Sequence, residues 1–217
     1  MLIRWKMSHV SDSVAARAEW FREQQRLFND AYLAPDNDEY QQSGWNGSAE
    51  RWKAGRAVIL DGITRNGDLL DVGCANGLLL HSLVAWAAER GQTVTPYGVD
   101  FVPGLIELAQ RRFPEQAANF SVANAWDWQP ERRYDYVHTL LELVPQGDQR
   151  AYLQRLLDEV VAPGGRLIVS NYGSRTENRR PLDVDLHLQM LGFHTIGCGN
   201  GREDDGWVAT RTAWIDR

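Results

Sequence analysis

Cysteine is scarce in this sequence, which holds only two in 217 residues, Cys74 and Cys198, and no Cys-x-x-Cys pair. A zinc site built from cysteines and a disulfide framework are therefore not expected, whereas two reduced thiols fit a cytoplasmic protein. Long apolar runs are scarce as well, because the longest, residues 78–88, contains His81 and is too short to span a bilayer. The first residues, MLIRWKMSHVSDS, lack the apolar stretch of a signal peptide. We expect a cytoplasmic protein without a membrane partner.

An excess of positive charge is also lacking. The formal net charge is -6 at pH 7, whereas a nucleic-acid surface normally carries a basic stripe. Nucleic acid is therefore not an expected partner, although the segment SRTENRRP (174–181) is basic enough to touch an anion. With 43% apolar and 24% charged residues, the composition is that of an ordinary globular protein with enough chain to bury a core. It leaves open a monomer or a homodimer.

Strand-like and helix-like segments alternate from residue 67 onward. The apolar patterns predict strands over 68–73, 93–100, 118–125, 133–143 and 166–172, and helices over 76–91, 103–113, 148–165 and near 181–191. Such alternation predicts a parallel sheet covered on both faces. Two last strands, 192–199 and 206–216, have no helix between them and predict an antiparallel pair at one edge. The fold class is therefore α/β, a doubly wound and mostly parallel seven-stranded sheet.

Residues 1–66 show a different pattern and predict a helical cap next to the sheet domain of residues 67–217. Helical periodicity covers 13–33 and 48–63, and a polar loop joins the two. Three aromatic residues of this segment, Tyr40, Trp45 and Trp52, are candidates for a substrate-side lid, because ring faces attract positive charge. Packing of the cap against the sheet is the alternative interpretation.

The stretch LLDVGCANGLLL (69–80) interrupts an apolar run with small and polar residues. At the carboxyl end of a first parallel strand the chain turns into a helix, and small residues let that turn pass close to a ligand. An acidic residue, Asp100, ends the second strand 23 positions after Gly77. That spacing places a carboxylate where ribose hydroxyls can donate to it. The pattern predicts a site for a nucleoside-containing cofactor.

The type of cofactor follows from the spacing within this turn. A dinucleotide site typically has G-x-G-x-x-G, whereas this chain has Asp71-x-Gly73-x-Ala75-x-Gly77. A carboxylate at Asp71 would repel a pyrophosphate, which disfavours a nicotinamide-dependent oxidoreductase. A cofactor with an amino group, a ribose and no phosphate fits better, and S-adenosylmethionine meets that description.

At this point the sequence resembles the class I S-adenosylmethionine-dependent methyltransferases. The segments that carry the resemblance are LLDVGCANG, YGVDFVPGLIELAQRRF, FSVANAWDW, YDYVHTLLELVP and APGGRLIVSNY, and it covers residues 68–215. It implies that the turn from Asp71 to Gly77 holds the methionine part and that Asp100 binds the ribose. The other cofactor positions that it implies are Phe101, Asn124, Ala125 and Trp126 around the adenine, with Thr139 and Leu140 at the methyl-transfer site. Ala75 and Asn124 depart from the family, which usually has glycine and often aspartate at these positions.

Methyl transfer from a sulfonium needs alignment above all, and a general base only when the acceptor must lose a proton. The candidate bases are Glu142 and His138, which flank the end of the fourth strand, and less favourably His187. Each has a structural interpretation as a satisfied histidine or a loop carboxylate. Tyr172, just beyond the fifth strand, is a further substrate-side candidate. No cluster with magnesium-ligand spacing occurs, so no metal is expected.

The sequence therefore predicts a methyltransferase acting on an oxygen or nitrogen of a small-molecule metabolite. The fourth strand ends in HTLLELVP, without the Asn/Asp-Pro-Pro-Tyr motif of enzymes that methylate amide or adenine nitrogens. One alternative is a tRNA or rRNA methyltransferase with the same cofactor domain. Another is a non-catalytic protein that binds S-adenosylmethionine, because this chemistry requires no particular catalytic side chain.

Overall fold

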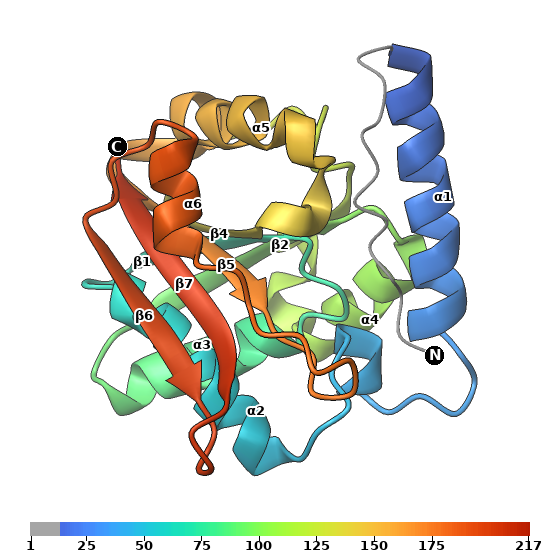
Figure 1. Cartoon of the computed structure of the whole chain (residues 1–217). Helices are drawn as coiled ribbons and strands as arrows, with labels where there is room; N and C mark the ends of the chain where they lie inside the picture. Colours follow the sequence, from blue (N-terminus) through green and yellow to red (C-terminus); the bar gives the residue numbers. More distant parts are fainter. Residues whose placement is uncertain (1–13) are drawn as a thin grey trace.

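A seven-stranded sheet forms the centre of the protein in the computed structural model, which describes residues 14–217 (Figure 1). The strands are β1 (Gly67–Val72), β2 (Val94–Asp100), β3 (Phe120–Val122), β4 (Tyr134–Leu140), β5 (Val161–Tyr172), β6 (Gly197–Arg202) and β7 (Val208–Asp216). Their order in the sheet is β3-β2-β1-β4-β5-β7-β6. Strands β1 to β5 run parallel, and β7 pairs antiparallel with both β5 and β6. The predicted fold class is confirmed, with β7 inserted between β5 and β6.

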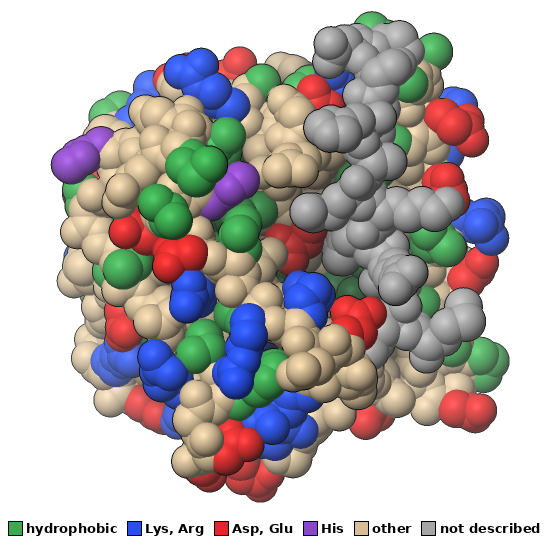
Figure 2. All heavy atoms as spheres, in the orientation of Figure 1, with side chains coloured by type: hydrophobic (Ala, Val, Ile, Leu, Met, Phe, Trp, Pro, Cys, Tyr) green, Lys and Arg blue, Asp and Glu red, His purple; other side chains and the backbone are tan. Residues whose placement is uncertain are grey.

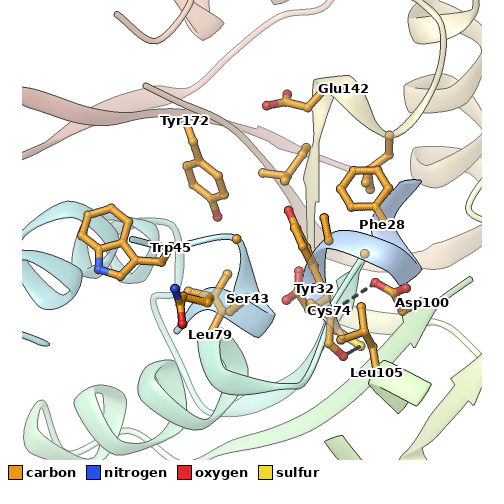
Figure 3. Close-up of a pocket in the computed structure, with 18 of the residues that line it drawn as sticks. Phe28, Tyr32, Ser43, Trp45, Cys74, Leu79, Asp100, Leu105, Glu142 and Tyr172 are labelled. Atoms are coloured by element: carbon orange, nitrogen blue, oxygen red, sulfur yellow. Dashed lines mark hydrogen bonds between the residues drawn. The ribbon is translucent and has the colours of Figure 1, made fainter. Parts of the chain in front are cut away.

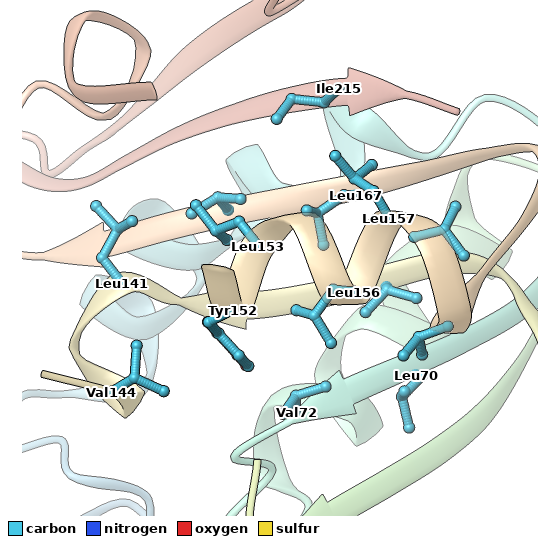
Figure 4. Close-up of a cluster of buried hydrophobic side chains, with 14 of the residues drawn as sticks. Leu70, Val72, Leu141, Val144, Tyr152, Leu153, Leu156, Leu157, Leu167 and Ile215 are labelled. Atoms are coloured by element: carbon cyan, nitrogen blue, oxygen red, sulfur yellow. The ribbon is translucent and has the colours of Figure 1, made fainter. Parts of the chain in front are cut away.

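Helices cover both faces of this sheet. They are α1 (Val14–Tyr32), α2 (Ala49–Arg56), α3 (Leu78–Glu89), α4 (Pro103–Arg112), α5 (Gln149–Arg155) and α6 (Val184–Met190). Helices α5 and α6 lie on one face, and α2 and α3 lie on the other (Figure 1). Figure 4 shows Leu153 and Leu156 packed over Leu70 and Leu167 of the sheet, all in one buried cluster. Burial of both sheet faces explains why the parallel strands read as continuous apolar runs.

The helix predicted over 148–165 ends earlier in the structure. The α-helix stops at Arg155, a π-helical turn follows over Leu156–Val160, and β5 begins at Val161. Val160 and Val161 are both fully buried, and β-branched residues suit a buried strand at least as well as a helix. Apolar periodicity alone does not separate the two in this short stretch.

Part of the predicted cap packs closely against the edge of the sheet. The first thirteen residues lie outside the described part of the chain, and α1 and α2 belong to the cap. The helix predicted over 48–63 is an α-helix to Arg56 and a 3₁₀ helix over Ala57–Gly62. Glycines of β6 face this segment: a Cβ on Gly199 would lie 2.6 Å from a Val58 methyl group, and one on Gly201 would lie 2.2 Å from the Gly55 carbonyl oxygen. Because these glycines have no side chains, the backbone of β6 can lie close to α2 and the 3₁₀ helix.

Among residues 14–217, no helix combines the length and the apolar character that are needed to cross a membrane.

We expect Gly201→Ala to lower the free energy of unfolding by about 1–3 kcal/mol, the usual cost of overpacking a tight contact. The cause is the clash of the new methyl group with the Gly55 carbonyl. Urea unfolding measures the change. The matched control is Gly147→Ala, because a Cβ there meets no atom within 4 Å, and a loss of equal size in both variants would contradict the packing argument.

Candidate functional site

A cavity of about 340 Å³ opens at the carboxyl edge of the parallel strands (Figure 3). In Figure 3, Asp100, Phe28 and Tyr32 stand on one side of it, and Tyr172 and Glu142 stand on another. The wall comes from α1, the loop after it, α2, the ends of β1, β2, β4 and β5, and the loop 173–179. Open α/β sheets bind ligands at this edge, and the volume lies in the range of small-molecule sites.

The turn between β1 and α3 forms the floor of this cavity. Gly73, Ala75 and Gly77 all adopt left-handed backbone conformations, with φ of 82°, 48° and 74°. Such φ values cost little for glycine and roughly 1–2 kcal/mol for a residue with a Cβ. Ala75 is held there because its N–H donates to the Asp100 carboxylate at 2.9 Å. The departure from the family's glycine is therefore accommodated by a specific hydrogen bond.

Asp100 joins the ends of two neighbouring strands. One carboxylate oxygen accepts from Ala75 N–H and the other from Val102 N–H, both at 2.9 Å. Burial raises the pKa of Asp100 from 3.8 to about 6, although these backbone N–H groups oppose the rise. Each carboxylate oxygen has a second lone pair, and Asp100 lines the cavity. The side chain can therefore accept further hydrogen bonds from a ligand.

A chain of buried polar side chains crosses the sheet beneath the cavity. His138 Nδ1 lies 2.7 Å from Asp71 Oδ1, and His138 Nε2 lies 3.0 Å from Ser170 Oγ. Ser170 Oγ in turn contacts Thr212 Oγ1 at 3.0 Å. The four residues come from β1, β4, β5 and β7, and all are almost fully buried. Both ring nitrogens of His138 are therefore engaged within the protein.

The end of β4 brings a second acid into the cavity. Glu142 accepts a hydrogen bond from Asn171 Nδ2 at 3.0 Å, and burial raises its pKa above the ordinary value. Tyr172, at the end of β5, lines the same cavity, and its buried hydroxyl has no hydrogen-bond partner within residues 14–217. Burial also raises the pKa of Tyr172. A carboxylate with a raised pKa thus lines the same cavity as a hydroxyl without a partner in the described chain.

Helix α1 covers one side of the cavity. Its inward residues Phe21, Gln24 and Phe28 are buried and line the cavity. The Phe28 ring centroid lies 5.9 Å from that of Phe101, the residue after β2. At the other end, Arg17 forms two hydrogen bonds of 2.8 Å to the Asp148 carboxylate. These contacts fix α1 across the strand ends.

Most of the predicted site residues meet at this cavity. The residues that line it are Asp71, Gly73, Ala75, Asp100, Phe101, Asn124, Ala125, His138, Leu140, Glu142, Trp45, Trp52 and Tyr172. Asn124 uses its side-chain oxygen to accept Trp126 N–H at 2.9 Å. Its side-chain NH₂ group and the second lone pair of its oxygen are left for a ligand.

Two predicted cofactor residues lie outside the cavity for reasons of strand and helix geometry. Thr139 points to the opposite sheet face from His138, because side chains alternate along a strand, and its hydroxyl contacts Tyr152 Oη at 2.6 Å. Gly77 faces α4, where an added Cβ would lie 3.1 Å from the Ala109 Cβ. It serves helix packing and the turn, and does not line the cavity.

Two predicted aromatic residues also lie outside the cavity. Trp126 packs beneath the Arg17 guanidinium, which lies 4.4 Å from the ring centroid. Tyr40 stands behind the cavity wall, with its ring centroid 5.8 Å from that of Trp52. His187 is remote as well and pairs with Gln149 Oε1 at 2.8 Å.

Sequence reasoning missed several lining residues, notably Phe28 and Tyr32 of α1 and Arg56 of α2. The α1 residues belong to its apolar stripe, which does not reveal what the stripe covers. Arg56 carried a usable signal, because it sits within the apolar run of the helix predicted over 48–63. A charge on an apolar helix face needs a partner or a function.

The basic segment 174–181 forms an ion-paired surface at the cavity mouth. Arg175 contacts Glu203 at 2.9 Å and also pairs with Asp205. Figure 2 shows Lys and Arg side chains gathered over this part of the molecule, with Asp and Glu side chains between them. Much of its positive charge is therefore balanced within the protein.

Known proteins share both sequence and fold with this chain. A family model described as a methyltransferase domain matches residues 45–194. A curated relative, the ribosomal protein L11 methyltransferase of Xylella fastidiosa, is 32% identical over an alignment of 154 residues that covers 68% of this chain and 43% of the relative. The matched region thus spans less than half the length of that protein.

Solved structures share the whole fold at low identity. The 1,6-didemethyltoxoflavin-N1-methyltransferase of Burkholderia thailandensis, with 1,6-didemethyltoxoflavin and S-adenosylhomocysteine bound, superposes with a TM-score of 0.62 at 16% identity, covering 96% of this chain and 93% of that one. The N-methyltransferase NodS of Bradyrhizobium japonicum, in complex with S-adenosylhomocysteine, gives 0.58 at 13% identity, covering 89% and 97%.

The raised pKa of Asp100 makes the stability of the protein depend on pH. Between about pH 4 and pH 6 the unfolded chain ionises this group while the folded chain keeps it protonated, so stability falls as pH rises through that window and stays level above it. The shift corresponds to a loss on the order of 3 kcal/mol. We expect Asp100→Asn to show a smaller decline in urea unfolding measured across the window, and Glu142, whose pKa burial also raises, to contribute the remainder.

The control is Asp61→Asn, whose carboxylate is half exposed beside Arg90. It should keep the decline. A slope that is the same in Asp100→Asn as in wild type would show that another group causes it.

Proposed function

The chain belongs to the class I S-adenosylmethionine-dependent methyltransferases, and we propose that it transfers a methyl group to an oxygen or nitrogen of a small-molecule acceptor. The observation that supports the proposal is the cavity at the strand ends, which Asp100 and the left-handed turn line together with Glu142 and Tyr172. One side suits a nucleoside and the other suits an acceptor. The cavity has the volume of a small-molecule site, which favours a small acceptor.

The residues present fit S-adenosylmethionine. Gly73 lets the Leu143 side chain pack directly on the turn, since an added Cβ would meet a Leu143 methyl carbon at 2.9 Å. Asp100 retains acceptor capacity for ribose hydroxyls, and Phe101 and Asn124 stand beside it for the adenine. The side-chain oxygen of Gln24, buried in the same cavity, has no partner within the described chain. An unsatisfied buried acceptor of this kind is rare, and a cofactor amino group would satisfy it.

The bound cofactor supplies a methyl group on a sulfonium sulfur, already activated for in-line displacement. The chain's task is to align the acceptor, exclude water and receive the proton that a hydroxyl or ammonium acceptor loses. We assign proton uptake to Glu142, because burial raises its pKa toward the range of a useful base. Asn171 orients the carboxylate through its 3.0 Å hydrogen bond.

His138 has a positioning role in this proposal. Its two ring nitrogens are engaged by Asp71 and Ser170, so neither is free to receive a proton from an acceptor. By holding Asp71 at the end of β1, it sets the start of the turn beneath the cofactor. Trp45, Trp52 and Tyr172 form the acceptor side.

A second candidate function is methylation of a ribosomal protein. The observation that favours it is the 32% identity to the Xylella fastidiosa enzyme named for that activity. The two candidates separate in a single experiment, in which radiolabelled S-adenosylmethionine is incubated with a library of hydroxyl- and amine-bearing metabolites and, separately, with ribosomal protein L11. Label transfer to metabolites supports the proposal, and transfer to L11 alone would replace it.

We expect Glu142→Gln to lower kcat for the acceptor identified in this way by about 100-fold or more, the usual contribution of a general base. Affinity for S-adenosylhomocysteine should stay within about twofold, since this side chain lies on the acceptor side. The matched control, Glu107→Gln, changes an exposed acid on α4 and should leave kcat unchanged. An unchanged kcat in Glu142→Gln would remove this residue from the mechanism.

A further inference from the structure

Arg56 is a buried cation in the wall of the cavity. Only 4% of its surface is exposed, and it lines the space that Glu142 and Tyr172 also line. Burial lowers its pKa from the ordinary value, yet an arginine keeps its proton in proteins. The protein thus holds a full positive charge at a position where charge is costly.

Aromatic rings surround this guanidinium. Its central carbon lies 3.5 Å from the Tyr172 ring centroid, 4.9 Å from that of Trp45 and 5.3 Å from that of Trp52. Ring faces attract a cation and hold it in a fixed plane. The arrangement orients the guanidinium without neutralising its charge.

Hydrogen bonding leaves most of this guanidinium unused. Within the described chain its side chain makes a single hydrogen bond, to Thr210 Oγ1 at 2.9 Å, whereas an arginine side chain offers five N–H donors. No ion pair of Arg56 occurs among residues 14–217. Glu203, one of the acids that act on it at a distance, is already held by Arg51 at 2.6 Å and by Arg175 at 2.9 Å.

Glu142 is the other acid that acts on Arg56 at a distance, and it limits what can bind there. It lines the same cavity without reaching Arg56, because its carboxylate is turned to Asn171. An anion that enters between them meets one guanidinium and one nearby carboxylate. Attraction to Arg56 and repulsion from Glu142 both grow with the charge of the ligand, so the geometry of the hydrogen bonds decides which anion fits.

We propose that Arg56 binds a carboxylate of the methyl acceptor, so that the acceptor is a small carboxylic acid held by a guanidinium between aromatic rings. The planar guanidinium group of an arginine can donate two parallel hydrogen bonds to the two oxygens of a carboxylate. This assignment deepens the proposed function and rests on it, because the acceptor occupies the same cavity as the cofactor. The anionic end is fixed at Arg56, and the acceptor atom is left free to reach the methyl group.

The test compares acids with their neutral amides on the complex with S-adenosylhomocysteine. Salicylate and salicylamide form one matched pair, and phenylacetate and phenylacetamide form a second. Calorimetric or ligand-observed NMR titration gives their dissociation constants on wild type, Arg56→Met and Arg56→Lys. We expect each acid to bind wild type about tenfold or more tightly than its amide, as charged hydrogen bonds allow. The preference should vanish in Arg56→Met and shrink in Arg56→Lys, which keeps the charge and loses the fork.

Arg111→Met is the matched control, because this arginine is two-thirds exposed on α4 and should keep the preference. Equal binding of acid and amide to wild type, including no binding of either, would overturn the proposal, as would a preference that survives in Arg56→Met. Tighter binding of phenyl phosphate than of both acids would overturn the choice of a carboxylate. S-adenosylhomocysteine is titrated into wild type first, since its failure to bind would contradict the proposed function and not the role of Arg56.

Discussion

The carboxylate of Asp100 is the contact on which the site depends. It lies at the end of β2 and accepts N–H groups from the β1–α3 turn and from the start of α4. The hydrogen bond from Ala75 N–H to this carboxylate stabilises the left-handed conformation of Ala75. The same carboxylate has lone pairs left for a ligand, so one side chain both builds the turn and faces the cavity. In the proposed function, this one residue both builds the turn and recognises the cofactor.

A second constraint comes from the alternation of side chains along β4. His138 and Leu140 face the cavity side, and Thr139 faces α5. His138 therefore links Asp71 to Ser170 by hydrogen bonds. The layer beneath the cavity is held by these hydrogen bonds. A buried carboxylate at Asp71 is tolerable because its neighbour donates to it. The buried polar groups of this chain find their hydrogen-bond partners within the protein.

The cap completes the site from the other side. Helix α1 contributes Gln24 and Phe28 to the cavity wall, and α2 contributes Arg56 and Trp52. The glycines of β6 allow α2 to lie close enough for Arg56 to reach Thr210 of β7. The glycines at this sheet edge thus help to set the position of Arg56 in the cavity wall.

The sequence allowed the sheet, its helices and the cofactor turn to be predicted, because apolar periodicity and glycine spacing are local signals. Two acids of the cavity were also predictable, since Asp100 ends β2 and Glu142 lies two residues beyond the end of β4. The features that could not be predicted depend on which way a side chain points and on contacts between distant parts of the chain. The resemblance implies that Thr139 lies at the methyl-transfer site, whereas side-chain alternation along β4 turns it toward α5. The apolar stripe of α1 does not indicate which surface it covers. Trp126 was assigned to the adenine, yet Arg17, more than a hundred residues earlier in the chain, covers it.

Calorimetric titration of the whole chain with S-adenosylhomocysteine and with NAD tests the central claim most directly. The account predicts binding of the sulfur nucleoside, no binding of NAD, and at least about tenfold weaker nucleoside binding in Asp100→Ala, which removes the ribose acceptor and the anchor of the turn. Binding of NAD, or nucleoside affinity that is unchanged in Asp100→Ala, would contradict it.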